Sequence, residues 1–246
     1  HPEVAPAEVF HQQLAPTANL NVGTHAENVA GLLISASATQ PFGTHHSVSP
    51  RASLYSSAYE TMGIDPGYQH ALISCQHVLL QNNGSVVAIN LSWGKQVAVG
   101  ANLDGNSLLT QGVDWSSRVH DALYVVSGNE GSGGIPVPTD EYNGVTVAFS
   151  KKVGGSYLQV DSGNFLGEDA HGPRRSIDLV APGADVTMPA LGGTFAAASG
   201  TSFAAPHVTG TVGLLQEHAT AQINASGAYW DSDARRHAVM KAVIMN

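Results

Sequence analysis

Residues 200–210 read Gly-Thr-Ser-Phe-Ala-Ala-Pro-His-Val-Thr-Gly and open a long apolar segment. Nearly every side of Ser202–Ala219 is apolar, which predicts a buried central helix. Ser202 would follow a glycine turn at the start of this helix, where backbone N–H groups and partial positive charge favour a developing oxyanion. A serine at this place is also a common N-cap residue. The nucleophile elbow of the α/β-hydrolases is excluded, because it requires Gly where Ala204 stands.

Composition limits the classes of protein to which this chain can belong. The 246 residues are 43% hydrophobic and 12% charged, which excludes a disordered protein. The net charge is −9 and no basic run is present, so nucleic acid is not an expected partner. No apolar run approaches the roughly 18 residues of a membrane span. The single Cys75 excludes an intrachain disulfide and a multi-cysteine metal site.

Apolar segments of two periods alternate along the chain. Strands are predicted at Ser53–Tyr59, Ser85–Ser92, Leu123–Ser127, Val145–Phe149 and Ile177–Val180. Helices are predicted at His25–Ala36, Asp65–Gln81, Asn106–Asp121, Ser202–Ala219 and Asp233–Met245, with Thr24 and Glu27 at capping-box spacing in the first. This alternation predicts an α/β fold with a mostly parallel sheet and helices on both faces. Because no repeat or linker is visible, residues 1–246 are predicted to form a single domain.

Two blocks make the chain resemble a known family. The pattern G-T-S-x-A-x-P-H-V-x-G at residues 200–210 is similar to the serine motif of the subtilisin-like serine proteases, the subtilases. Residues 178–183 (Asp-Leu-Val-Ala-Pro-Gly) resemble the D-[LV]-x-A-P-G that precedes this serine in the family. The resemblance covers essentially the whole chain. It implies a subtilisin-like three-layer sandwich and a serine endopeptidase whose nucleophile, Ser202, forms an acyl-enzyme intermediate.

A third block supplies an oxyanion hole under this resemblance. Residues 125–131 (Val-Val-Ser-Gly-Asn-Glu-Gly) resemble the family's V-x-A-[AS]-G-N-[ED]-G. Asn129 would donate its amide N–H to the oxyanion, a role that suits an uncharged dipole that does not titrate. Gly-Asn after a strand is also ordinary turn chemistry. The resemblance further implies that Ser127 and Gly128 border the substrate.

The candidate general base is His25. An ungapped match sets residues 25–31 (His-Ala-Glu-Asn-Val-Ala-Gly) on the family's H-G-T-H-V-A-G, whose first His is catalytic. If Gly23-Thr24-His25 were set on the G-T-H of that pattern instead, Val22 would stand at the position of the base. This match is therefore rejected. Three positions depart from the pattern: Ala26, Glu27 and Asn28. A His in the first turn of a helix is biased toward the neutral, proton-accepting form, whereas a nearby carboxylate acts in the opposite direction.

Substrate binding is expected along Ser92, Trp93 and Gly94. Residues 87–94 (Val-Ala-Ile-Asn-Leu-Ser-Trp-Gly) resemble the family's V-I-N-M-S-x-G, where the backbone after the serine pairs with the extended substrate and borders the main specificity pocket. Such pairing is β-augmentation, which suits a protease because it reads no particular side chain. Trp93 would narrow or roof the pocket. A packed core aromatic is the alternative interpretation.

No Asp precedes His25 that could act as the acid orienting the base. Only Glu3 and Glu8 precede His25, whereas the family's Asp lies N-terminal to the base at the end of a central strand. Residues 1–4 (His-Pro-Glu-Val) resemble the H-P-[DE]-[LV] that follows this Asp in the family. We therefore expect the chain to be incomplete, with the acid and its strand just before residue 1. Without this acid and its strand, residues 1–246 should be a poor protease and should fold poorly, with a gap in the sheet.

Two other functions stay open. A sedolisin-like acid peptidase shares the fold and the serine motif but uses Glu as base and Asp in the oxyanion hole, and Asn129, Pro206 and His207 argue against it. A catalytically inactive subtilase-fold domain for binding or scaffolding is kept open by the altered residues around His25.

No cofactor and no metal is required by the expected chemistry. Many subtilases bind calcium, but Asp161, Glu168 and Asp169 lack a regular oxygen-ligand spacing, so no particular site is predicted. Polypeptide substrates are the expected partners, and the sequence leaves the oligomeric state open. The family implies a secreted or cell-surface protein, although this chain carries no signal-peptide pattern.

Overall fold

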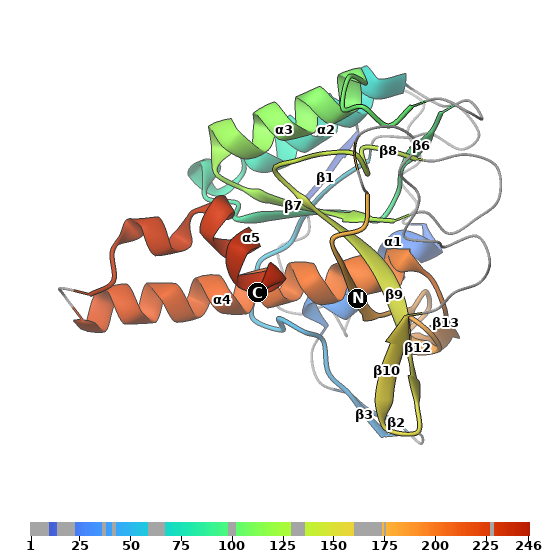
Figure 1. Ribbon diagram of the computed structural model, residues 1–246. Coiled ribbons are helices and arrows are strands. Elements are labelled where there is room, and N and C mark those ends of the chain that lie inside the picture. The colour runs from blue at the N-terminus through green and yellow to red at the C-terminus, as the bar shows by residue number, and fades with distance from the viewer. Residues whose placement is uncertain are drawn as a thin grey trace.

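The fold is a mostly parallel sheet between two layers of helices (Figure 1). The computed structural model describes residues 10–13, 23–35, 38–40, 43–58, 67–97, 102–128, 136–159, 174, 176–226 and 229–246. The helices α2 (Gly67–Leu79) and α3 (Leu108–His120) cover one face of the sheet, and α4 (Thr201–Ser226) and α5 (His237–Met245) cover the other. This arrangement confirms the predicted α/β sandwich.

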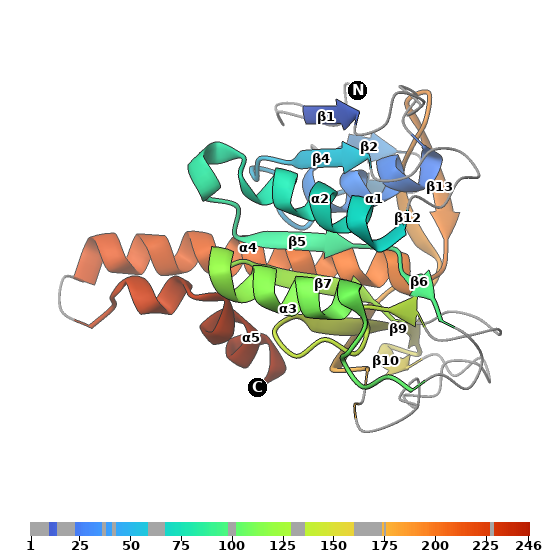
Figure 2. The same ribbon diagram turned by 90° about the horizontal axis from the view of Figure 1, so that it is seen from above.

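In the part of the chain that the structure describes, the central sheet has five strands. Four of them are parallel to one another: β5 (Ala88–Leu91), β7 (Leu123–Ser127), β9 (Val145–Val153) and β11 (Leu179–Pro182). The fifth, β10 (Ser156–Gln159), forms an antiparallel hairpin with β9. A separate parallel pair consists of β1 (Phe10–Gln13) and β4 (Tyr55–Ala58). Among the described residues no pairing joins β4 to β5, and Figure 2 shows the two groups of strands one beside the other.

Shorter elements complete the fold. Three antiparallel pairs are formed by β2 (Ala38–Gln40) with β3 (Gly43–His45), β6 (Lys95–Gln96) with β8 (Pro136–Val137), and β12 (Val186–Ala190) with β13 (Thr194–Ala198). The remaining helix is α1 (Thr24–Ile34), and two 3₁₀ turns are η2 (Asn82–Gly84) and η3 (Ser232–Arg235).

The core lies on both faces of β7, whose five residues are all buried. Leu123 and Val125 belong to the cluster that α4 covers, and Tyr124 and Val126 belong to the cluster under α2 and α3. Successive side chains of a strand point to opposite faces, so a strand covered on both sides needs an unbroken apolar run. The unbroken apolar sequence that predicts this strand is therefore explained by its central position, covered by helices on both faces.

Close packing of α2 on α3 explains a glycine in mid-helix. A Cβ on Gly112 would lie 2.4 Å from a methyl carbon of Leu72, a distance that real Cβ atoms do not show. The glycine therefore costs some helix propensity but allows the two helices to approach, and α3 continues through it.

The predicted capping box at the start of α1 is wrong. Gly23 is the N-cap, with no side-chain cap, and Thr24 is already inside the helix. The backbone N–H of Glu27 donates to the Gly23 carbonyl (3.1 Å), so the first helical hydrogen bond is made one residue earlier than the spacing predicts. The predicted start of α2 at Asp65 lies outside the described residues.

The predicted helix Asp233–Met245 is also wrong as one element. It is broken at Arg236, whose backbone is extended (φ −65°, ψ 142°), into η3 and α5. The N–H of His237 donates to Asp121 Oδ1 (2.9 Å), so a carboxylate from the end of α3 caps α5 at the break.

Candidate active site

Ser202 lies in the first turn of α4, directly after a glycine turn. The Gly200 carbonyl accepts a hydrogen bond from the Phe203 N–H (3.1 Å), and the helix begins one residue before the serine. Ser202 is therefore inside the helix and is not its N-cap. The Gly200 N–H donates to the Gly183 carbonyl (2.7 Å), so the block at residues 178–183 holds the turn that presents the serine.

The carboxyl ends of β5 and β7 meet the start of α4. These strands are parallel neighbours, so their ends share one edge of the sheet, where α/β proteins commonly bind ligands. After β7, the Gly128 carbonyl accepts from Thr201 Oγ1 (2.8 Å). After β5, Ser92 Oγ donates to the Ser202 carbonyl (2.7 Å), and Ser202 Oγ donates to the Ser92 carbonyl (3.3 Å). Two strand ends thus fix the beginning of the helix.

His25 lies on the exposed side of the first turn of α1, beside this helix start. Its ring and the ring of Phe203 are 5.7 Å apart between centroids and inclined by 44°. Phe203 directly follows Ser202, so the structure brings the predicted base to the turn that carries the predicted nucleophile. The apolar side of α1 packs with Phe203 and with Met188 of β12 in one cluster.

Two of the three altered residues around His25 serve the packing of α1, whereas Ala26 is exposed. Glu27 and Asn28 are only 4% and 6% exposed. In the amide orientation that satisfies its neighbours, the Asn28 nitrogen donates to the carbonyls of Pro189 (3.1 Å) and Thr24 (2.9 Å). A Cβ on Gly31 would lie 2.7 Å from the Pro189 ring, so this glycine is required where α1 crosses β12.

Ser127 and Gly128 are buried at the end of β7, and Asn129 lies outside the described residues. The Gly128 N–H donates to the Val147 carbonyl (2.9 Å). A Cβ on Gly128 would lie 2.7 Å from Ile177 Cδ1 and 3.2 Å from the Val147 carbonyl oxygen. Any larger residue at the end of β7 would therefore require Ile177 or the Val147 backbone to shift.

Trp93 and Gly94 follow Ser92 and are half-buried. Trp93 packs against the core cluster under α2 and α3, so at least part of its indole is a core group. The chain then enters β6, which pairs with β8, with Lys95 opposite Val137. The expected substrate-binding segment is thus attached to the rest of the protein on both sides.

Two histidines close to the serine turn have lowered pKa values. Burial lowers the pKa of His207, whose Nδ1 lies 2.8 Å from the Phe203 carbonyl oxygen. Burial also lowers the pKa of His45, against the effect of a backbone hydrogen bond at Gly31, and its Nε2 lies 2.8 Å from Ser35 Oγ. Both environments favour the neutral imidazole.

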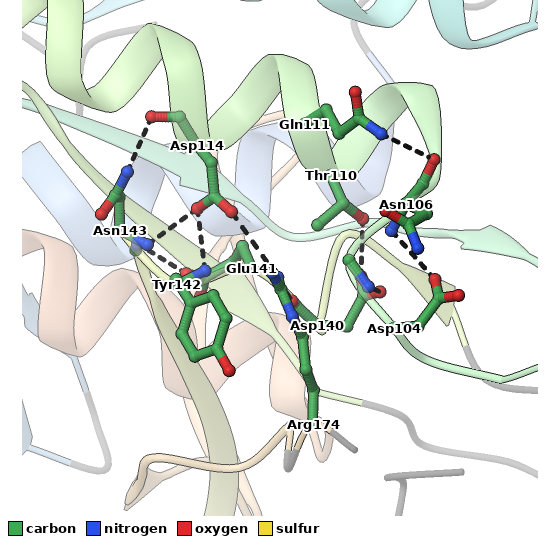
Figure 3. A network of polar contacts seen from close by, with 12 residues as sticks. Asp104, Asn106, Thr110, Gln111, Asp114, Asp140, Glu141, Tyr142, Asn143 and Arg174 are labelled. Atoms are coloured by element: carbon green, nitrogen blue, oxygen red, sulfur yellow. Dashed lines mark hydrogen bonds and ion pairs between the residues drawn. The ribbon is translucent and has the colours of Figure 1, made fainter. Parts of the chain in front are cut away.

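A polar network fixes the chain between β8 and β9 (Figure 3). Asp140 is 2% exposed and accepts hydrogen bonds from the Gly105 N–H (2.7 Å) and the Thr110 hydroxyl (2.5 Å), both at the start of α3. Asp114 accepts from the N–H groups of Tyr142 and Asn143, each at 2.8 Å. The turn at residues 138–144 is therefore tied to α3 at two places.

Arg174 closes this network. Its guanidinium donates to the Asp140 carbonyl, lies 3.6 Å from an Asp114 oxygen and stands over the Tyr142 ring at 3.8 Å. Because β8 pairs with β6 just after Gly94, the network supports the edge where substrate is expected. No local pattern predicts this network, because its partners are distant in sequence and form no motif.

Glu141 is a buried carboxyl group beside this turn, 6% exposed. It accepts hydrogen bonds from the Gly144 N–H (2.5 Å) and from Thr146 Oγ1 (3.2 Å). Burial raises its pKa to about 8, opposed by Lys241 and reinforced by Asp178. Glu141 is therefore a structural group that favours its protonated form.

No metal centre is seen in the part of the chain that the structure describes: there, no three His, Cys, Asp or Glu side chains are grouped to hold an ion. The acidic residues considered for calcium, Asp161, Glu168 and Asp169, lie outside that part. None of the helices in the described ranges combines the length and hydropathy that a membrane span requires.

Sequence comparison relates the chain to proteases. A family model described as the subtilase family matches residues 8–246. Subtilisin Savinase of Lederbergia lenta is 29% identical over 195 residues, which are 78% of this chain and 63% of the relative. An alkaline protease of Alkalihalobacillus alcalophilus is also 29% identical over 195 residues, 78% of this chain and 44% of the relative. The chain thus spans between 44% and 63% of these relatives' lengths.

Solved structures share the fold. The prenylagaramide maturation protease PagA superposes with a TM-score of 0.68 at 19% identity, over 99% of this chain and 78% of that one. The S41 psychrophilic protease gives a TM-score of 0.65 at 23% identity, over 96% and 76% of the two chains.

Proposed function

The chain belongs to the subtilase family, and from this premise we propose that it is a serine endopeptidase that forms an acyl-enzyme intermediate. Ser202 attacks the peptide carbonyl, and His25 accepts the proton from its hydroxyl and later donates it to the leaving amine. The observation that carries the proposal is the turn at the start of α4, where Phe203 places its ring beside that of His25 directly after the serine.

The oxyanion would be held by Asn129 and by the Ser202 N–H. The first N–H groups of an α-helix have no acceptor within the helix, and the helix dipole favours negative charge there. The end of β7 is fixed beside this point by the hydrogen bond between Thr201 and Gly128. A fixed donor at this place stabilises the transition state more than the substrate.

The substrate backbone would pair with the segment Ser92–Gly94 and lie against Ser127 and Gly128. These segments follow neighbouring parallel strands and flank the helix that carries Ser202. Main-chain pairing accounts for the binding of polypeptides with varied side chains. Trp93 would contribute to the pocket wall with the part of its indole that the core does not cover.

The acid that orients His25 would stand on a further parallel strand between β4 and β5. The support for this is the lack of pairing between β4 and β5 in the described ranges, where β4 pairs with β1 and β5 with β7. A strand there would join the two parallel groups into one sheet.

The proposed chemistry uses no cofactor and acts on polypeptides. Membership of the family leads us to expect a secreted or cell-surface protein, which detection in the culture medium or at the cell surface rather than in the cell lysate would test. The role of calcium is tested by adding a chelator, which should leave the reactivity of the serine unchanged if the metal takes no part in the chemistry.

A fluorophosphonate probe tests the proposal directly. The natural full-length protein should form a covalent adduct, and mass mapping should place it on Ser202. Ser202→Ala should abolish the adduct and His25→Ala should slow its formation strongly, whereas Ser232→Ala, at an exposed position in η3, should have no effect. A folded protein that forms no adduct contradicts the proposal and favours an inactive binding or scaffolding domain.

A further inference from the structure

The helix α4 carries a proline in its interior, at residue 206. Proline has no backbone N–H, so Pro206 cannot donate to the carbonyl four residues earlier, which is that of Ser202. A buried carbonyl that loses its helical partner needs another donor. Ser92 Oγ supplies it, at 2.7 Å. The backbone of the proposed nucleophile is therefore held by a side chain from the sheet rather than by its own helix.

Ser92 is in turn held by two further side chains. Asn90 Nδ2 donates to Ser92 Oγ (2.8 Å), and Asn90 Oδ1 accepts from Thr209 Oγ1 (3.0 Å). Thr209 lies on α4 and is 8% exposed, as is Ser92. These hydrogen bonds leave α4 at Thr209, pass through the end of β5 and return to α4 at Ser202. We call this set of hydrogen-bonded residues, Thr209, Asn90, Ser92 and Ser202, the Asn90 network.

All hydrogen bonds of the Asn90 network are donated in one direction, from Thr209 toward Ser202. The Thr209 hydroxyl, which also lies 3.1 Å from the Ala205 carbonyl oxygen, donates to Asn90. Asn90 donates to Ser92, and Ser92 donates to the Ser202 carbonyl, so these bonds polarise one another in the same sense. Both ends of the Asn90 amide are used: its oxygen faces the Thr209 hydroxyl and its nitrogen faces Ser92. If the amide were replaced by an acceptor at both ends, the Ser92 hydroxyl would turn toward it and leave the Ser202 carbonyl.

We propose that Asn90 and Thr209 are positioning residues for Ser202. They replace, through Ser92, the helical hydrogen bond that Pro206 removes, and so keep the serine hydroxyl where it reacts. Neither needs to touch the substrate, and both act through Ser92. The inference rests on the proposed function of Ser202. Displacing a reacting group by about 1 Å costs roughly 10² in rate, so the effect is expected in kcat and not in KM.

The chain offers matched variants for the test. Thr209→Val removes the hydroxyl at nearly constant volume, and Thr209→Ser restores it. Thr211→Val is the control, because Thr211 Oγ1 donates to the His207 carbonyl (2.8 Å) on the same helix but does not belong to the Asn90 network. Asn90→Asp keeps the size of the side chain and replaces the donor to Ser92 with an acceptor.

The experiment measures the rate of fluorophosphonate labelling of the natural full-length protein, kcat and KM on an internally quenched peptide, and the thermal unfolding midpoint. Thr209→Val should lower labelling and kcat about fivefold, the effect of one lost hydrogen bond, with KM unchanged. Asn90→Asp should lower both about 10²-fold. Thr209→Ser should recover to within about twofold. The double variant should be no slower than Asn90→Asp alone, because both act through one path.

The outcomes separate the two hypotheses. If the wild type is labelled and Thr209→Val reacts at the wild-type rate, the inference is overturned and the proposed function stands. The same holds if Thr209→Val and Thr211→Val lose equal stability and equal rate. A wild type that is not labelled overturns the proposed function and the inference with it. If Asn90→Asp does not fold, the comparison of Thr209→Val with Thr209→Ser decides.

Discussion

Glu141→Gln should make the protein more stable at alkaline pH. The buried Glu141 carboxyl group accepts from the Gly144 N–H and lies 3.2 Å from Thr146 Oγ1. In its protonated form it can donate to that hydroxyl, and the hydroxyl can still donate to the Thr139 carbonyl (3.3 Å). Glutamine reproduces this pattern without a titratable proton. The variant therefore imitates the protonated glutamate at every pH.

The magnitude follows from the raised pKa of Glu141. Folding moves this pKa from 4.5 to about 8, mainly through burial, so the folded protein holds the proton more tightly than the unfolded chain. The stabilisation is present in full below pH 4.5 and is lost as the pH rises through about 8. At about 1.36 kcal/mol for each pKa unit, this interval corresponds to at most roughly 5 kcal/mol of unfolding free energy.

The assay is urea unfolding of wild type and Glu141→Gln at pH 5 and pH 8.5, followed by circular dichroism. The two proteins should differ by less than about 1 kcal/mol at pH 5, whereas the variant should be more stable by about 2–5 kcal/mol at pH 8.5. His45 and His207, whose pKa values are lowered by burial, destabilise the wild type as the pH falls. The comparison at each pH cancels their contribution, because both proteins contain them.

A control and a refuting result complete the design. Glu217→Gln removes an exposed carboxylate that pairs with Arg51, and it should change stability by less than about 1 kcal/mol at either pH. If Glu141→Gln differs from the wild type by the same amount at both pH values, Glu141 does not change its protonation on folding, and the reasoning from burial is refuted.

Three further predictions concern the proposed active site. Asn129→Leu should lower kcat by about 10²–10³ with little change in KM, a range borrowed from subtilisin, a member of the same family; unchanged kcat on a peptide substrate would remove Asn129 from the mechanism. Trp93→Ala should widen the tolerance for large apolar side chains on a peptide library, whereas an unaltered profile with a lower unfolding temperature would make Trp93 a core residue only. Gly128→Ala should slow fluorophosphonate labelling and destabilise the protein by about 1–3 kcal/mol, because its Cβ would lie 2.7 Å from Ile177 Cδ1; a fully stable and reactive variant would contradict this.

The parts of the fold that local patterns determine could be predicted. The apolar run of β7 gave its bounds. The helix α4 is covered as predicted as far as Gly210, whereas Thr211, Leu214, Glu217 and His218 are exposed, so the second half of the predicted buried helix is wrong. The break at Arg236 could not be predicted, because the group that caps α5 is Asp121, far away in sequence. The capping box failed because the spacing of Thr24 and Glu27 does not show where the helix starts.

In the proposed site, too, local motifs predict some residues, and contacts between distant segments determine the others. Motifs predicted roles for His25 and Ser202, and the structure places both beside the start of α4. Asn90 lies in the motif at residues 87–94 and Thr209 in the serine motif, but neither was given a role, because their hydrogen bond exists only when β5 packs on α4. Arg174 belongs to no motif, and its partners come from separate loops.

The contact between Asp121 and His237 has a consequence for local unfolding. Asp121 Oδ1 accepts the backbone N–H of His237 at 2.9 Å and lies 2.5 Å from its Nδ1. Because α3 and α5 lie on opposite faces of the sheet, this contact joins the two layers (Figure 1). The amide protons of α5 should therefore exchange with solvent in the same opening event as those of the last turn of α3, rather than by fraying of the helix alone.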